Sequence, residues 1–379
     1  MTGIPRRLSE WSRSPAATRS LVLVRVVVLV SVLAGVPSYP SAAATRYQDI
    51  ARSTGTPYRD HEVEFAPGEL AIAELVGRSD PSTARILLAL LAFAGDFGAF
   101  LALRKGWGTA TAQRYLWLGL PLLIFIYRRA DLVTVAVAVT AVLWARIHRE
   151  GAAGIAMAVA FLTRLWPVIL TPIWVIERRR RALWVFASAA SAGVVAWIAF
   201  GGIGAIGQVS SFRGASGWEL ESSVGVVVWA LTGEHRFESG ANRTGMVPGW
   251  AGPLTLALLI AIFALVWLRA SRIASDPAGG AALAAVASLL AVSPLLSLQY
   301  ASWLLPWGAI AGGAGRRWSM AAAIPIVLTG AVIAGWYLDL GLGAGRDQII
   351  LFLRNGALVA IVVAYFVWSE DPTVRAPAR

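Results

Sequence analysis

The sequence predicts an all-α integral membrane protein that crosses the bilayer several times. Of its 379 residues, 57% are hydrophobic and only 14% are charged, whereas about a quarter of the residues in a soluble domain are charged. The hydrophobic residues form long runs, and many reach the roughly 18 residues that can cross a bilayer core. Most of this apolar surface must therefore face lipid or neighbouring helices rather than water.

The basic residues are concentrated in short segments between the apolar runs. The clearest cases are 178–181, which is four consecutive arginines, and the pair 316–317. A net charge of +12 would suggest nucleic-acid binding in a soluble protein, but this spacing is typical of cytoplasmic loops. We therefore expect a lipid bilayer and no nucleic acid as partner. We also expect a multi-pass plasma-membrane protein with a cytoplasmic N-terminus.

Cysteine is absent from the chain, which excludes disulfides, thiolate nucleophiles and cysteine-based metal sites. The three histidines, His61, His148 and His235, are too scattered for a histidine-rich metal site. The sequence also lacks a Walker loop, an HExxH motif and a GxGxxG motif in the right context. We therefore expect neither a metal ion nor an organic cofactor.

The order of apolar segments gives the expected architecture, a single membrane domain over 1–379. We count about ten or eleven segments, since the stretch 115–176 can be divided in more than one way. The cytoplasmic ends are 1–19 and 369–379. The apolar stretches lie at 20–36, 83–103, 115–127, 131–146, 151–163, 165–176, 182–200, 250–268, 280–297, 300–314, 319–338 and 349–368, and the count is lower than these twelve because the short stretches between 115 and 176 do not all form separate segments.

The first apolar segment, 20–36, has two interpretations. It is a secretory signal if SAAA at 41–44 is a cleavage site, or a retained span, which we favour because many spans follow. In both cases the acidic stretch 37–81 lies outside the cytoplasm as a loop, since carboxylates are expensive at membrane depth. We expect this loop to carry short interfacial helices.

The paired short segments 151–163 and 165–176 flank Arg164. Such pairs can form half-helices that pack against protein rather than lipid. An arginine at the centre of a span costs about 2.5–3.5 kcal/mol on insertion scales. Arg164 therefore needs a structural partner, such as Asp96 or Asp131, or a ligand such as phosphate.

The acidic segment 58–68 carries the first candidate for chemistry. Pro57 and Pro67 constrain the backbone around Asp60, and Tyr58 is suited to anchoring it at the headgroup level. A fixed carboxylate near the membrane surface has the properties of a general base for a sugar or lipid hydroxyl. The alternative is solvated surface charge.

The second long polar stretch, 202–248, also falls outside by the alternation of basic segments. It includes an apolar piece at 224–231 that can dip into the interface. His235 is either a titratable site residue or an exposed loop histidine. Further along, Gln299 and Tyr300 interrupt two apolar segments, either as a plain helix break or as an amide and aromatic platform facing a sugar.

Five pieces of sequence occur in a particular order along nearly the whole chain. They are PYRDHEVEFAPG (57–68), RADL (129–132), TRLWP (163–167), Arg213-Gly214 followed by Glu221-Ser222, and SLQYASWLLP (297–306). Together they resemble the polytopic GT-C glycosyltransferases, specifically the bacterial family 87 mannosyltransferase-like proteins. Where the family has lysine this chain has Arg164, which keeps the charge but changes its geometry.

The resemblance implies a GT-C-type helical bundle with an extracytoplasmic active site. It implies an inverting transfer of a hexose from a polyprenyl-phosphate donor to a glycolipid or cell-envelope glycan, and we expect mannose. Asp60 would be the general base, and Arg164, Arg213 and His235 would bind the donor phosphate. The expected substrate-binding residues are Tyr58, His61, Glu64, Glu221, Gln299 and Tyr300.

Two functions from other classes stay open, namely a transporter or flippase for a lipid-linked sugar, and a scaffold without activity. A transporter needs polar residues spread through the membrane depth, whereas these candidates cluster at the outer ends of the spans. No internal repeat favours an inverted-repeat transporter. Sugar transfer is therefore the function that the sequence favours.

Overall fold

The computed structural model describes residues 14–35, 42–211, 216–238, 240–273, 275–337 and 344–368. The chain is 77% helical, so the predicted all-α polytopic membrane protein is confirmed. Six helices in these ranges are long and apolar enough to cross a membrane. They are α2 (Pro15–Leu33), α5 (Pro81–Trp107), α11 (Arg180–Gly201), α14 (Ala251–Ala270), α17 (Arg316–Tyr337) and α18 (Ala344–Val367).

Shorter helices fill the space between the long ones. The α-helices among them are α6 (Thr109–Gly119), α7 (Leu123–Ile126), α8 (Asp131–Arg146), α9 (Glu150–Thr163), α10 (Pro172–Ile176), α15 (Gly280–Val292) and α16 (Leu305–Ala311). Four 3₁₀ helices connect them: η1 (Leu120–Leu122), η2 (Trp166–Leu170), η4 (Leu298–Leu304) and η5 (Gly312–Ala314). The expected pair of half-segments around Arg164 is thus present, as α9 followed by η2 and α10.

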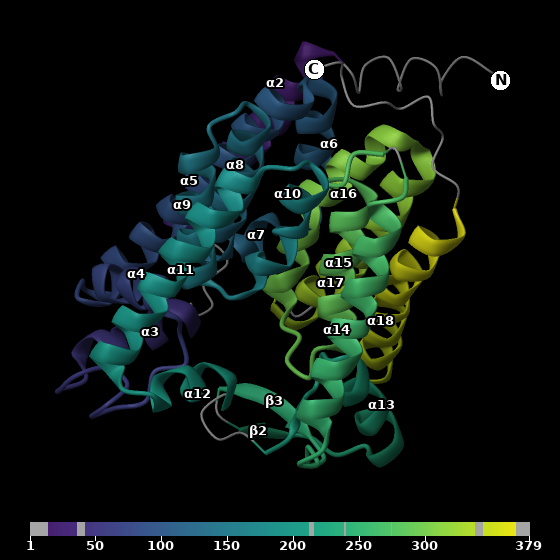
Figure 1. Ribbon diagram of the computed structural model, residues 1–379. Coiled ribbons are helices and arrows are strands. Elements are labelled where there is room, and N and C mark those ends of the chain that lie inside the picture. The colour runs from purple at the N-terminus through teal and green to yellow at the C-terminus, as the bar shows by residue number, and fades with distance from the viewer. Residues whose placement is uncertain are drawn as a thin grey trace.

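The helices form two packed groups, one from each half of the chain (Figure 1). In the first, α8 packs against α5 and α9, and α9 packs against α11. In the second, α18 packs against α15 and α17. Small residues allow the closest approaches: a Cβ at Gly95 of α5 would lie 2.6 Å from the backbone of Leu132 in α8, as is common between membrane helices.

Two of the expected spans differ from their hydropathy, one by ending early and one by being divided into shorter helices. The segment expected at 280–297 stops at Val292, where Ser293 adopts an extended backbone before Pro294, because proline disfavours the α-conformation of the preceding residue. The segment expected at 300–314 is η4 followed by α16. The predicted break at Gln299 and Tyr300 is therefore present, as a 3₁₀ turn.

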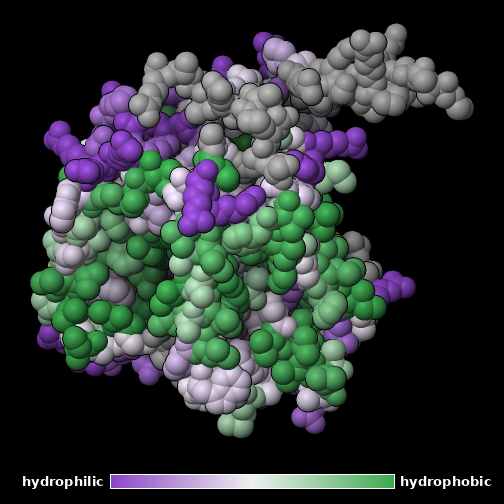
Figure 2. Space-filling view, turned by 45° about the vertical axis from the view of Figure 1, so that its right-hand side comes forward, coloured by the Kyte–Doolittle hydropathy of each residue, from purple (hydrophilic) through white to green (hydrophobic). Residues whose placement is uncertain are grey.

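Basic side chains collect at one end of the bundle. The segments that carry them are 104–105 at the end of α5, Arg146 at the end of α8, 178–181 before α11, Arg269 at the end of α14 and 316–317 at the start of α17. Figure 2 shows hydrophobic side chains over the middle of one face and hydrophilic ones gathered at its upper edge. This distribution is typical of a protein whose apolar middle lies in a bilayer.

The opposite end carries the two polar stretches (Figure 1). The first contains α3 (Ala42–Arg52) and α4 (Pro67–Gly77), so the short helices expected in that loop are present. The second contains α12 (Gly204–Ser211), α13 (Ser223–Thr232) and a small antiparallel sheet with strand order β1-β3-β2. The strands, β1 (Trp218–Glu219), β2 (Arg236–Glu238) and β3 (Ala241–Thr244), were not predicted, because each has too few residues to show alternation.

A buried ion pair joins α2 to α5. The Nε of Arg25 donates to Oδ2 of Asp96 at 2.9 Å, and the hydroxyls of Tyr115 and Tyr127 donate to the same carboxylate at 2.7 and 2.6 Å. Asp96 is therefore the partner of Arg25, and its suggested pairing with Arg164 is wrong. The first apolar segment packs into the bundle through this contact.

Candidate active site

A cavity of about 620 Å³ lies at the end of the bundle that carries the sheet. Its volume is within the range of small-molecule sites, roughly 300–1,000 Å³. Walls come from α3, α4, the start of α8, the sheet and the turn at 297–300. The polar residues that line it include Arg46, Asp49, Glu64, Glu69, Arg129, Arg164, Glu219, Arg243, Gln299 and Tyr300.

Arg164 holds two buried carboxylates at the back of this cavity. Its Nη2 lies 2.7 Å from Oε1 of Glu69 and 3.5 Å from Oδ2 of Asp131. Arg164 ends α9 in an extended conformation, and Glu69 lies in the first turn of α4. The predicted pairing with Asp131 is confirmed, and Glu69 is the closer partner that the sequence analysis missed.

Two aromatic donors complete this cluster. The hydroxyl of Tyr47 donates to Oε1 of Glu69 at 2.8 Å, and Nε1 of Trp303 donates to Oδ1 of Asp131 at 3.1 Å. Burial raises the pKa of Glu69 to about 7, although Arg164 lowers it. The net charge of this cluster is therefore expected to change around neutral pH.

The contribution of Glu69 to the stability of the protein is predicted to fall as the pH rises from about 5 to about 7. The pKa of Glu69 is above its ordinary value of 4.5 in the folded state, so the folded protein binds this proton more tightly than the unfolded chain does. Its contribution to stability is thus largest below the unfolded pKa, declines up to about pH 7 and is constant above that. Thermal unfolding of the detergent-solubilised chain should show this slope.

The matched variants are Glu69→Gln and Glu74→Gln, both on α4. Glu69→Gln should flatten the dependence of the melting temperature on pH, whereas Glu74→Gln, whose carboxylate faces Arg78 on the surface, should retain the wild-type slope. Equal slopes in the two variants would assign the pH dependence to other groups.

Three aromatic rings form a stack beside the cavity. The ring centroids of Tyr300 and Trp303 are 4.2 Å apart, and those of Trp303 and Trp166 are 4.9 Å apart. Tyr300 and the neighbouring Gln299 line the cavity itself. The structure therefore brings the amide and aromatic pair to the cavity, where a sugar ring can lie against the tyrosine.

The acidic loop contributes Glu64 to the cavity wall. The guanidinium of Arg46 donates from Nε to Oε1 and from Nη2 to Oε2 of Glu64, at 2.8 and 2.7 Å. This bidentate pair fixes both side chains. Phe65 packs edge-on against Tyr47 at 5.4 Å, so the loop is docked on α3.

Asp60, from the same loop, lies outside the cavity lining. Asp60 is exposed, and its Oδ2 accepts from the backbone N–H of Thr56 at 2.5 Å. Gly55 has a φ of +90°, and a Cβ there would lie 2.5 Å from Cβ of Asp60, so the turn requires glycine. The role of Asp60 as a base stays a prediction, and its position gives it a structural part in this turn.

Tyr58 and His61 also lie outside the lining. Tyr58 packs against Trp197 of α11 with ring centroids 5.8 Å apart, and its hydroxyl donates to the carbonyl of Phe65 at 2.7 Å. His61 is half-buried, and neither ring nitrogen has a hydrogen-bond partner among the described residues. Tyr58 is part of the contact between the loop and α11–α12, and neither residue is part of the cavity wall.

The candidate residues of the second polar stretch do not all lie at the cavity. His235 is exposed and packs beside Trp229 at 5.7 Å, and it is not part of the lining. Arg213 falls outside the described residues. Glu219 does line the cavity, and its Oε1 accepts from the hydroxyl of Ser297 at 3.2 Å. The sequence analysis did not select Glu219, although its neighbour Glu221 was chosen.

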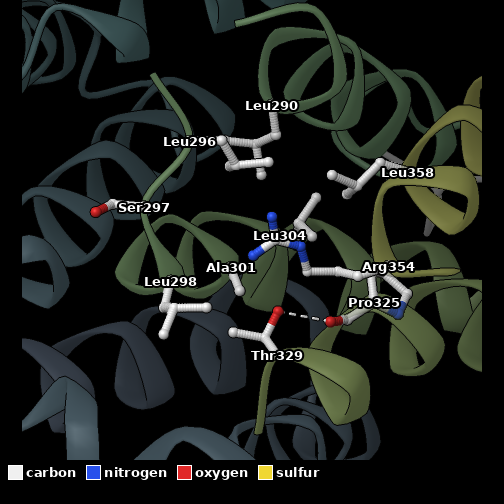
Figure 3. A pocket seen from close by; sticks show the side chains of 10 residues that line it. All are labelled: Leu290, Leu296, Ser297, Leu298, Ala301, Leu304, Pro325, Thr329, Arg354 and Leu358. Carbon is white, nitrogen blue, oxygen red and sulfur yellow. Dashed lines mark hydrogen bonds between the residues drawn. The ribbon is translucent and has the colours of Figure 1, made fainter. Parts of the chain in front are cut away.

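Glu221 does not line the cavity and is held by α18. Its backbone carbonyl accepts from Arg354 and from Asn355, and burial raises the pKa of its carboxyl to about 8. Arg354 reaches into a small, largely apolar cavity of about 10 Å³, which is room for one water molecule. In Figure 3 the hydroxyl of Ser297 points away from this small cavity, which agrees with its bond to Glu219.

Comparison with known proteins found no relative: no family model matches the chain, and no curated protein matches it. The assignment of function therefore depends on the cavity. In the part of the chain that the structure describes, no group of three or more His, Asp and Glu is arranged to hold a metal ion.

Proposed function

We propose that this chain is a membrane glycosyltransferase that moves a hexose from a polyprenyl-phosphate donor to a hydroxyl of a glycolipid or cell-envelope glycan. The observation that supports it is the cavity of about 620 Å³, which combines arginines, carboxylates and the stacked ring of Tyr300. Phosphate requires cations, and sugar hydroxyls require carboxylates and amides. Mannose is the first sugar to test.

The position of the cavity relative to the basic helix ends supports an extracytoplasmic site. Basic segments mark the cytoplasmic side of membrane proteins, and the cavity lies at the opposite end of the bundle. Nucleotide sugars are scarce outside the cytoplasm, so a transferase there needs a lipid-linked donor. The apolar surface of the bundle gives the polyprenyl chain a place beside the helices.

The chemistry of such a transfer needs a base and an anion site. A carboxylate removes the proton of the acceptor hydroxyl as its oxygen attacks the anomeric carbon, through an oxocarbenium-like transition state. The phosphate leaves as an anion, so a cation stabilises it without a general acid. Arg164, fixed by Glu69 and Asp131, supplies positive charge at the back of the cavity.

The test is sugar transfer in proteoliposomes that contain the full-length chain, radiolabelled polyprenyl-phosphate mannose and a membrane lipid extract. A labelled glycolipid that depends on the protein is the expected product. Tyr300→Ala should raise the KM for the donor about tenfold or more if the aromatic stack holds the sugar. Movement of label across the bilayer without a new glycolipid would instead identify a transporter of lipid-linked sugar.

A further inference from the structure

Eight charged side chains line the large cavity, and six of them already have partners. Arg46 is bound to Glu64, and Arg164 to Glu69. Glu219 accepts from Ser297, and the guanidinium of Arg243 donates to the carbonyls of Gly217 and Glu238. The charged groups of these six residues are therefore engaged with neighbouring residues of the protein.

Asp49 is one of the two charged residues left. The residues of α3 that line the cavity include Ala42, Thr45, Arg46 and Asp49, whose spacing of three and four places them on one helix face. Asp49 is exposed, and its carboxylate has no hydrogen bond or ion pair among the described residues. The carboxylates of Glu69 and Glu219 each keep one oxygen buried and inaccessible.

Arg129 is the second charged residue of the lining without a hydrogen-bond or ion-pair partner among the described residues. It is half-buried beside the start of α8, and its guanidinium lies 5.1 Å from the ring centroid of Phe125, which fixes its position by a cation–π contact. Its guanidinium donates no hydrogen bond to the residues that the structure describes. Its charge opposes the rise that burial causes in the pKa of Glu219 and of Glu221, so it lies within electrostatic reach of both.

We propose that Asp49 is the general base and that Arg129 is the ligand of the leaving phosphate. This inference rests on the proposed glycosyl transfer, and it differs from the expectation that Asp60 and Arg164 carry these roles. Asp60 lies outside the lining, and Nη2 of Arg164 is directed at the carboxylates of Glu69 and Asp131. Asp49 and Arg129 line the cavity and have no hydrogen-bond or ion-pair partner among the described residues, so an incoming substrate can bind them.

The step balances without a further reactant. The acceptor oxygen forms a bond to the anomeric carbon of the donor sugar, and its proton passes to the carboxylate of Asp49. The bond between the anomeric carbon and the phosphate oxygen breaks, and its electron pair stays on that oxygen. Polyprenyl phosphate leaves with the added negative charge beside the guanidinium of Arg129.

Two measurements on the full-length protein separate the roles. One is binding of farnesyl phosphate, with inorganic phosphate as a parallel probe, and the other is the kinetics of mannose transfer. The variants are Asp49→Asn and Arg129→Gln. Their matched controls are Glu62→Gln, an exposed carboxylate of the acidic loop, and Arg85→Gln, an exposed arginine that contacts only its own turn of α5. Size-exclusion profiles verify folding.

Arg129→Gln is expected to weaken farnesyl phosphate binding and to raise the donor KM, each about tenfold or more, which is the usual effect of losing a charge-assisted hydrogen bond. Asp49→Asn is expected to lower kcat by about 10²-fold or more with little change in binding, as for a general base. The control variants should stay within about twofold of wild type, the scatter that surface substitutions normally show.

Each contrary result overturns a defined part. Farnesyl phosphate binding by Arg129→Gln equal to that of Arg85→Gln would overturn the phosphate ligand, and unchanged kcat in Asp49→Asn would overturn the base while leaving the proposed function intact. Binding that depends on Arg129, without mannose transfer by wild type, would support the phosphate ligand and refute mannose transfer. Equal affinity for inorganic phosphate would refute a lipid-phosphate site.

Discussion

Arg164→Gln is expected to remove measurable sugar transfer and to lower the melting temperature by many degrees. The substitution leaves the carboxylates of Glu69 and Asp131 buried and close together without the cation that lies 2.7 and 3.5 Å from them. Removal of one partner from a buried ion pair costs about 3–5 kcal/mol. Part of that cost is avoided here because Glu69, with a pKa of about 7, can take up a proton.

The second variant in this series is the double substitution Glu69→Gln/Arg164→Gln. It removes one charge of each sign, so stability should return toward that of wild type while transfer stays lost. Arg164→Lys should keep most of the stability and part of the activity, because a lysine supplies charge without the planar fork of donors. Thermal unfolding in detergent and transfer in proteoliposomes are the two measurements.

A different pattern would assign Arg164 another role. If the double variant recovered transfer together with stability, Arg164 would matter only for holding α4 against α9. If Arg164→Gln transferred sugar normally, the positive charge at the back of the cavity would have no part in stabilising the leaving phosphate.

The partners of Arg164 could be predicted from the sequence only in part. An arginine between two apolar half-segments indicates that its charge has a partner, and Asp131 was correctly named as one. Asp96 was not a correct choice, because it lies on α5 among Arg25, Tyr115 and Tyr127. Glu69 was missed because α4 reaches the cluster only through the fold of the first polar stretch, which hydropathy does not describe.

The cavity illustrates a second limit. Gln299, Tyr300, Glu64 and Arg164 were selected from the sequence, and all four line it. Tyr58, Asp60 and His61 were selected from the same acidic loop as Glu64, but the turn at Gly55 and the contact with Trp197 direct them elsewhere. A short loop of alternating charge gives no periodicity from which to tell its two sides apart.

Asp49 and Arg129 could have been selected as candidates from the sequence. Asp49 is spaced by three residues from Arg46 on a short amphipathic helix, and Arg129 begins the RADL motif. What the sequence lacks is information on which charges are neutralised by neighbours. That property depends on contacts between α3, α4 and the sheet, which are distant in the chain.

Asp96→Asn is expected to destabilise the protein more than any variant on its surface. Arg25 stays charged, and its Nη1 and Nη2 are already buried without a partner among the described residues, so the substitution removes its only counter-charge there. Loss of one member of a buried pair costs about 3–5 kcal/mol, and low-dielectric surroundings in the membrane do not relieve it. Thermal unfolding in detergent should show an early, broad transition or no folded protein.

The double variant Arg25→Met/Asp96→Asn tests whether charge is the cause. Methionine fills much of the space of the arginine stem. The asparagine carbonyl still accepts from one of the two tyrosine hydroxyls, and its NH₂ group can donate to the oxygen of the other, so most of the lost stability should return. If the double variant is as unstable as Asp96→Asn, the loss comes from packing between α2 and α5. If it recovers, the ion pair is an anchor for the first helix, and a chain that lost α2 by cleavage would leave Asp96 buried in the bundle without Arg25.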